Sequence, residues 1–197
     1  MKSPFSLVSS TSALLLALCA FPHVSAKLQN LEAKTRSALT CADPSTSVPL
    51  YFTELPNNND FYTTSITAVT TRVSTQGYVF QGVVARVFVA QEISTVPLFH
   101  LTRIVDFPLA IDDLYTVSTA DRDSVVASGF YKFVDIAGYV YPSQICGSVP
   151  FYRLWQAGAV RHFYTTSLEK RDAMLATGSW ADEGIEGYVL EDNGGCA

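Results

Sequence analysis

The hydrophobic residues after position 47 fall into short runs that return in a fixed order along the chain. Most runs have the length of a β-strand and are separated by polar or glycine-containing turns. One stretch in each cycle begins with a serine that can cap a helix, contains a narrow apolar stripe and ends at a glycine, so it predicts a short helix. Each cycle therefore predicts a strand, a second strand, a short helix and two further strands.

Four landmarks define three copies of this unit. They are a strand that begins with Val-Pro, a strand with a tyrosine at its centre, the glycine that ends the helix and a closing strand. The copies are residues 48–95, 96–148 and 149–197, a period of about 50 residues that is typical of repeat architectures. The equivalent tyrosines are Tyr62, Tyr115 and Tyr164.

Three such copies predict one mainly β domain with short helices. A single copy cannot bury both of its faces, whereas three copies around an axis can share a core. Four strands in each of three copies is the layout of a β-trefoil, so we expect a pseudo-three-fold, β-trefoil-like domain. A small, propeller-like closed repeat is the alternative.

The first 26 residues predict a secretory signal peptide. Lys2 supplies the positive start, residues 13–21 form a short apolar run, and Val24-Ser25-Ala26 offers the small residues that signal peptidase requires. The apolar run is too short to span a bilayer. Residues 27–47 form a lead-in to the copies, and we expect a secreted, extracellular protein with no membrane span.

The charge balance narrows the classes of partner. The chain has 13 basic and 18 acidic residues, a formal net charge of −5 at pH 7. This balance argues against nucleic acid as a partner, because nucleic-acid binding depends on neutralising phosphates. Aromatic residues make up 12% of the chain and charged residues 16%, which fits a compact β protein rather than a disordered one.

The cysteines predict one disulfide. After cleavage at residue 26 the chain keeps Cys41, Cys146 and Cys196, so one pair and one remaining cysteine are expected in an oxidising compartment. Cys41 precedes the copies and Cys196 follows them, so we favour this pair, which would tie the ends of the domain together. Cys146 with Cys196 is the alternative. Neither Cys-x-x-Cys nor His-x-x-x-His occurs, so the sequence predicts no metal site.

The third copy resembles a repeat of secreted fungal proteins and bacterial surface proteins. Residues 150–154 read PFYRL, 162–167 read HFYTTS and 183–189 read EGIEGYV, where the family unit reads P-L-Y-R-L-Y, H-F-Y-T-T-S and E-G-I-A-G-Y-V. The resemblance covers residues 48–190. It implies an extracellular three-fold β domain with carbohydrate as the expected ligand, in a family of unknown function with no established activity.

The copies depart from the family pattern in different ways. The family has N-P-x-T-G-D before H-F-Y-T, and the first copy keeps this turn character in residues 55–60. The third copy has QAGAVR at 156–161, and the second has a longer apolar insertion at 102–112. The copies are therefore not equivalent, and we expect a ligand site where the symmetry is broken.

No catalytic motif stands out in the sequence. It contains no G-x-S-x-G elbow, no phosphate-binding glycine loop and no zinc-protease motif. A triad of His162, Ser167 and Asp172 is conceivable, but Ser167 is better explained as a helix cap and the other copies carry aspartate in place of His162. We therefore expect a protein that is not an enzyme and needs no cofactor.

Aromatic and polar side chains provide the candidate ligand-binding residues, because sugars stack on aromatic faces while polar groups hold their hydroxyls. Trp155 and Trp180 occur only in the third copy, so they have more reason to be exposed than a repeated core residue. The predicted set is Arg153, Trp155, His162, Tyr164, Trp180, Asp60 and Tyr62. For the repeated tyrosines, a core layer around the three-fold axis is the favoured interpretation.

These observations favour a secreted, non-catalytic binding module whose partner is a glycan or cell-wall polysaccharide. A trefoil-type proteinase inhibitor is the first alternative, with residues 102–112 as the loop that it would present to a protease. A structural extracellular protein is the second.

Overall fold

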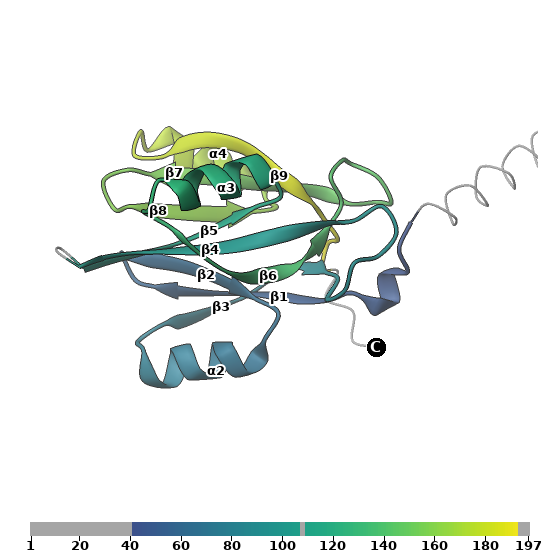
Figure 1. Cartoon of the computed structure of the whole chain (residues 1–197), viewed down its shortest axis with the longest axis horizontal. Helices are drawn as coiled ribbons and strands as arrows, with labels where there is room; N and C mark the ends of the chain where they lie inside the picture. The colour runs from purple at the N-terminus through teal and green to yellow at the C-terminus, as the bar shows by residue number, and fades with distance from the viewer. Residues whose placement is uncertain (1–40, 107–108, 193–197) are drawn as a thin grey trace, which may run out of the picture. The chain divides into compact units, whose positions relative to one another are not determined.

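The computed structural model describes residues 41–106 and 109–192. The predicted signal peptide, lead-in residues 27–40 and Cys196 lie outside the described residues. The described part begins with a short 3-10 helix, η1 (Pro44–Thr46), and continues with three copies of a strand–strand–helix–strand unit (Figure 1).

Each copy contributes the same four elements. The first copy contains β1 (Val48–Leu55), β2 (Asn59–Thr63), α2 (Ile66–Thr75) and β3 (Val79–Val87). The second contains β4 (Val96–Asp106), β5 (Leu109–Thr116), α3 (Thr119–Ala127) and β6 (Lys132–Val140). The third contains β7 (Val149–Gln156), β8 (Arg161–Thr165), α4 (Leu168–Ala176) and β9 (Ala181–Val189).

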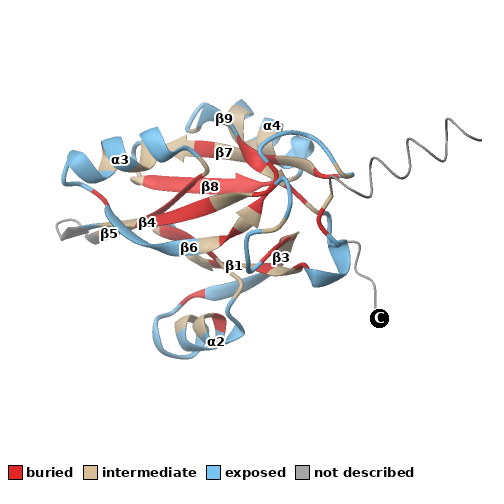
Figure 2. Cartoon of the chain, turned by 45° about the vertical axis from the view of Figure 1, so that its right-hand side comes forward, coloured by how far each residue is buried: buried red, intermediate tan, exposed pale blue. Residues whose placement is uncertain are grey.

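The predicted helix signals are confirmed. The side chain of a serine caps each helix start by accepting the backbone N–H three residues later, at Ser65, Ser118 and Ser167. The glycine after each helix has a positive φ of 71–79°, which glycine adopts without strain, at Gly77, Gly129 and Gly178. The helices lie on the outside of the strands, which hold most of the buried residues (Figure 2).

The strands form three antiparallel sheets of three strands, with the orders β2-β1-β3, β5-β4-β6 and β8-β7-β9. Among the described residues these sheets do not close into one barrel. The prediction of a mainly β fold with short helices is confirmed, and a pseudo-three-fold arrangement is compatible with the sheets. Closure into a trefoil or a propeller stays a prediction.

Each copy has one long strand after its helix, where the sequence analysis predicted two. The residues around Gly184 and Asp135, where a turn between the two predicted strands would fall, lie inside β9 and β6. Opposite them the strand register shifts, between Arg153 and Leu154 in one sheet and between His100 and Leu101 in the other. A bulge of this kind bends a strand without reversing it. The residues at a bulge therefore resemble a turn in the sequence, although the strand is continuous.

The insertion in the second copy also differs from the prediction. Residues 102–106 and 109–112 belong to paired strands rather than to a loop, with Arg103 opposite Asp112 and Asp106 opposite Leu109. The apolar character of this segment is explained by strand formation, because β-branched residues such as Ile104 and Ile111 favour strands. The second copy therefore has a longer hairpin than its neighbours.

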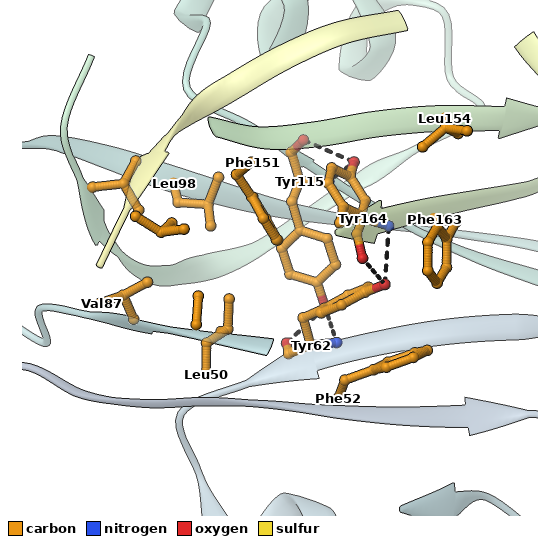
Figure 3. Packing of buried hydrophobic residues seen from close by; sticks show 13 residues of the cluster. Leu50, Phe52, Tyr62, Val87, Leu98, Tyr115, Phe151, Leu154, Phe163 and Tyr164 are labelled. Carbon is orange, nitrogen blue, oxygen red and sulfur yellow. Dashed lines mark hydrogen bonds between the residues drawn. The ribbon is translucent and has the colours of Figure 1, made fainter. Parts of the chain in front are cut away.

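The three repeated tyrosines form a closed ring of hydrogen bonds at the centre of the domain (Figure 3). The Tyr62 hydroxyl donates to the Tyr164 carbonyl and accepts from the Tyr164 N–H, both at 2.9 Å. The Tyr164 hydroxyl contacts the carbonyl and N–H of Tyr115 at 2.8 and 2.7 Å. The Tyr115 hydroxyl contacts the carbonyl and N–H of Tyr62 at 2.8 and 3.0 Å. Each tyrosine thus joins two copies.

The ring is buried and its hydroxyls stay protonated. The three aromatic rings meet edge to face with centroids 5.4–5.5 Å apart, an arrangement that aromatic quadrupoles favour. Burial raises the pKa of all three hydroxyls well above its usual range. Aliphatic and aromatic side chains of all three copies surround the ring, among them Leu50, Leu98, Phe151, Val87, Val140 and Val189.

The ends of the long strands join in a second cyclic pattern. Two backbone hydrogen bonds link each of the pairs Arg86–Leu190, Phe88–Tyr139 and Tyr141–Tyr188. Each pair joins a different two of the three copies, so every copy contacts both others at this end as well. The copies therefore form one folding unit and not three separate ones.

The favoured disulfide between Cys41 and Cys196 is wrong. Cys41 pairs with Cys146, across a Cα–Cα distance of 5.6 Å and a sequence separation of 105 residues. The reason is that Ala42 packs on the second copy, in a cluster with Phe88 and Tyr141, and its N–H donates to the Tyr141 hydroxyl at 3.2 Å. This contact places Cys41 beside Cys146. The bridge thus fastens the segment before the first copy to the end of the second.

We predict that Tyr115→Phe destabilises the protein by on the order of 2–4 kcal/mol, because it leaves the buried carbonyl and N–H of Tyr62 without a partner. Chemical denaturation of the variant and of wild type measures this difference. Tyr51→Phe, at a half-buried position outside the ring, is the matched control and should change stability far less. Equal effects of the two substitutions would contradict the role assigned to the ring.

Candidate functional site

A third cyclic set of contacts surrounds the tyrosine ring, made by the residues three and two positions before each tyrosine. These residues are Asn59-Asp60, Asp112-Asp113 and Arg161-His162. All six are buried. The first residue of each dipeptide contacts the second residue of the dipeptide in the following copy, and the third copy is followed by the first.

Two of these contacts involve an aspartate of the second copy. Asn59 Nδ2 donates to Asp113 Oδ2 at 2.7 Å. Asp112 Oδ1 accepts the backbone N–H of His162 at 2.7 Å, and Asp112 Oδ2 lies 2.7 Å from His162 Nδ1. The first residue is thus the amide and the second the carboxylate in one contact, whereas the first is the carboxylate and the second the imidazole in the other.

The contact between the third and first copies is a bidentate ion pair. Arg161 Nε and Nη2 donate to the two carboxylate oxygens of Asp60, at 2.5 and 2.8 Å, and Nη2 also donates to Glu54 at 2.8 Å. Removing one partner of a buried pair strands a charge and is strongly destabilising, so both partners must be present together. The three contacts are chemically different, and each occurs between one particular pair of copies.

Burial and the neighbouring charges shift the pKa values of these groups. Burial raises the pKa of Asp60 to about 6, although its hydrogen bonds with Arg161 act in the opposite direction. Burial lowers the pKa of His162, but the hydrogen bonds with Asp112 and Glu183 outweigh it, so this pKa is raised. The protonated imidazole of His162 is therefore stabilised in the folded protein.

Outside these pairs, the helix of each copy faces the sheet of the following copy across a cleft. The helix residue at each cleft follows the capping serine by three positions, and it is Ala68, Asp121 or Lys170. The residue on the opposite middle strand is His100, Arg153 or Phe52. The three clefts are thus equivalent in the fold but lined by different side chains.

The cleft between the second and third copies is filled by charged side chains. Arg153 Nη1 lies 3.1 Å from Asp121 Oδ2 and 2.7 Å from Glu186 Oε1. Arg153 Nε lies 2.8 Å from Glu183 Oε2, at ion-pair distance but without hydrogen-bond geometry. Arg153 is mostly buried by these carboxylates, which leaves it little surface for a ligand.

A lysine lies over the equivalent place between the third and first copies. Lys170 Nζ lies 4.9 Å from the ring centroid of Phe163 and 5.9 Å from that of Phe52. A cation over an aromatic face is attracted by the ring quadrupole. The long Lys170 side chain therefore covers the aromatic surface of this cleft.

The cleft between the first and second copies stays open, as a cavity of about 270 Å³. Ala68 stands where the other helices carry Asp121 and Lys170, and Ala137 of β6 stands where β9 carries Glu186. These small side chains leave the space unfilled. A shallower hollow of about 390 Å³ continues from the cavity over α2. We call this space the open cleft.

His100 forms the inner wall of the open cleft. Its Nε2 lies 2.7 Å from Asp113 Oδ1 and its Nδ1 lies 3.1 Å from Asp135 Oδ1, while its ring stacks on Tyr115. Burial lowers the pKa of His100, but the two carboxylates outweigh it, so the pKa is raised. Both ring nitrogens are engaged by carboxylates, and Ser65 Oγ, which also lines the cleft, accepts the Ala68 N–H as a helix cap.

Arg72 forms the outer wall. Its guanidinium carbon lies 3.4 Å from the ring centroid of Phe61 and 4.9 Å from that of Tyr78. On the opposite side, the Asp135 side chain is 63% exposed, so its carboxylate faces solvent at the cleft mouth. The open cleft therefore presents a stacked guanidinium, hydroxyl groups and an exposed carboxylate.

The structure does not gather the predicted binding residues into one exposed site. Trp155 is half-buried, with its ring 4.5 Å from that of His162, and Trp180 is half-buried with its ring 6.0 Å from that of Phe163. Tyr164 is fully buried, as is Asp60. Of the predicted set, Tyr62 is the residue that lines the open cleft.

The set of residues predicted from the sequence does not contain His100, Asp135, Arg72 or Ala68. A comparison of the three copies position by position carries a signal for Ala68, because a small residue replaces Asp121 and Lys170 directly after the capping turn. His100 carries a weaker signal, since Phe52 and Arg153 show that this position varies. The contacts of Asp135 depend on the strand bulge. In the sequence, the residues at this bulge resemble a turn.

A comparison with known protein families gives one match. The family described as Domain of unknown function (DUF5648) matches residues 47–190. The chain belongs to this family. Searches of the curated proteins and of the solved structures found no significant match. The prediction of a family of unknown function is thus confirmed, whereas the predicted secretion and repeat pattern of its members stay predictions.

Two further features bear on the predicted partners. No helix within residues 41–106 and 109–192 is long and apolar enough to cross a membrane. In the same part of the chain, no group of three or more histidine, cysteine, aspartate or glutamate side chains is placed to hold a metal ion.

We predict that the free energy of unfolding falls as the pH rises above 6.5. The folded pKa values of His100 and His162 are raised, so the folded state binds more protons than the unfolded state, and this stability is present below pH 6.5 and lost as the pH passes through the folded pKa values. Urea denaturation over this range measures the slope. The double variant His100→Gln/His162→Gln should flatten it, and a wild-type stability that rises over the same range would refute the assignment.

Proposed function

We propose that this chain is a secreted, non-catalytic carbohydrate-binding protein whose ligand occupies the open cleft between the first and second copies. The observation that carries the proposal is the difference between three equivalent clefts. Charged side chains occupy two of them, whereas Ala68 and Ala137 leave the third open. A trefoil-like scaffold with one unfilled cleft is suited to binding one small ligand.

The size and chemistry of the open cleft support a sugar. Its volume of about 270 Å³ is near the lower end of the range for small-molecule sites, roughly 300–1,000 Å³. Ser65 and Thr64 offer hydroxyl groups and Asp135 an exposed carboxylate, which are the groups that hold sugar hydroxyls. The aromatic ring of Phe61 also lines the cleft. This combination of apolar and polar surface fits a sugar ring.

The contacts of His100 support binding rather than catalysis. A general base needs a ring nitrogen within hydrogen-bond reach of the proton that it removes. In this cleft carboxylates engage both nitrogens of His100, and the hydroxyl of Ser65 caps a helix. The side chains are therefore held in fixed positions, which lowers the entropy lost when a ligand binds.

The disulfide supports an extracellular location. Disulfides such as Cys41–Cys146 form and persist mainly in oxidising compartments. The signal peptide predicted in residues 1–26 leads to the same compartment. We therefore propose that the protein meets its glycan outside the cell.

The test is to place in the open cleft a side chain that occupies an equivalent cleft of the same protein. Ala68→Lys places at this cleft the side chain that Lys170 provides at another, and we expect it to weaken glycan binding about ten-fold or more, measured by titration calorimetry with the best ligand from a glycan panel. Thr70→Lys adds the same charge at an exposed position of the same helix and should leave the affinity unchanged.

Two outcomes would overturn the proposal. If wild type binds no glycan of the panel at millimolar concentration, carbohydrate is not the ligand. If Ala68→Lys and Thr70→Lys bind a glycan equally well while both remain folded in thermal melts, the ligand does not occupy the open cleft.

A further inference from the structure

The helix arginine of the first copy differs from those of the other two. Arg122 and Arg171 each contact the aspartate that follows them, with Nη2 2.7 Å from Asp123 and from Asp172. Val73 follows Arg72, and no carboxylate of the described residues lies within ion-pair distance of Arg72. Its charge is therefore not neutralised by a contact within this part of the chain.

The position of Arg72 also differs. Arg122 and Arg171 follow their capping serines by four residues and stack on Phe99 and Tyr152 of the middle strands. Arg72 comes nearly one helical turn later and stacks instead on Phe61. This shift directs Arg72 to the open cleft, which it lines together with Ser65 and His100.

From these contacts we infer that the ligand of the open cleft is an acidic sugar, whose carboxylate binds the guanidinium of Arg72. This inference rests on the proposed function. Stacking on Phe61 occupies one flat face of the guanidinium, and Arg72 also lines the open cleft. Guanidinium N–H groups match a carboxylate in geometry and can bind it with two parallel hydrogen bonds.

The other charged groups of the cleft fit the same ligand. His100 faces Asp113 and Asp135, so the protonated imidazole offsets one of these two negative charges. The exposed Asp135 carboxylate on the opposite wall accepts hydrogen bonds from hydroxyl groups and repels an anion. A sugar ring with one carboxylate therefore has a single favoured orientation, with its acidic group on Arg72 and its hydroxyls toward Asp135.

The experiment compares an acidic oligosaccharide that contains a uronic acid with its methyl ester, which keeps the ring and removes the charge. We expect wild type to bind the acid about ten-fold or more tightly than the ester in titration calorimetry, and this preference to weaken with added salt. A sulfated sugar, measured in parallel, tests whether sulfate can replace the carboxylate.

Substitutions test whether Arg72 causes the preference for the acid over the ester. Arg72→Gln should abolish this preference, so that acid and ester bind with equal affinity, and a thermal melt reports that the variant is folded. Arg72→Lys, which keeps the charge but loses the two-pronged geometry, should retain part of the preference. Arg122→Gln is the matched control, because it removes a helix arginine that contacts Asp123, and should leave the preference intact.

The outcomes separate the two claims. If wild type binds acid and ester equally, or binds only the sulfated sugar, or keeps its preference in Arg72→Gln, the inference of an acidic sugar held by Arg72 is wrong while the proposed function stands. If wild type binds neither acid nor ester nor any neutral sugar, both claims fail.

Discussion

The fold depends on a hydrogen-bond ring that no single copy can form. Each hydroxyl of Tyr62, Tyr115 and Tyr164 donates to a backbone carbonyl and accepts a backbone N–H of another copy. Without these contacts six buried backbone groups would have no partner, which proteins rarely tolerate. The three copies must therefore assemble together, and the apolar side chains of all three then close around the ring.

Around this symmetric centre the polar contacts are asymmetric. Equivalent positions hold an amide with a carboxylate, a carboxylate with an imidazole, and a guanidinium with a carboxylate. A change at one of these positions requires a matching change in the neighbouring copy, because an unmatched buried charge is costly. The differences between the copies at these positions are thus matched across the interfaces between copies.

The sequence predicted what the local pattern determines. The three copies, the helix caps at Ser65, Ser118 and Ser167, and the glycines that end the helices follow from local chemistry, and the structure has them. The local pattern does not predict the contacts between copies, because these contacts depend on how strands far apart in the sequence are aligned. The bulge opposite His100 resembles a turn in the sequence, and the packing of Ala42 on the second copy has no local signal. Both the number of strands and the disulfide pairing were therefore missed.

The candidate site shows the same limit. Trp155 and Trp180 stand out in the sequence because they are large and unrepeated, yet both pack against neighbouring side chains. The open cleft arises from small residues, Ala68 and Ala137, whose importance appears only beside the residues that fill the equivalent clefts. The open cleft does lie where the symmetry of the copies is broken, but the break consists of missing side chains rather than added ones.

Amide hydrogen exchange followed by NMR tests the shared core most directly, because it reports the free energy needed to expose each backbone N–H. The account predicts that the amides of Tyr62, Tyr115 and Tyr164 exchange with one common free energy, equal to that of global unfolding. If the tyrosine amide of one copy exchanged at a clearly lower free energy than the other two, that copy would open by itself, and the account of three copies held by one ring would be contradicted.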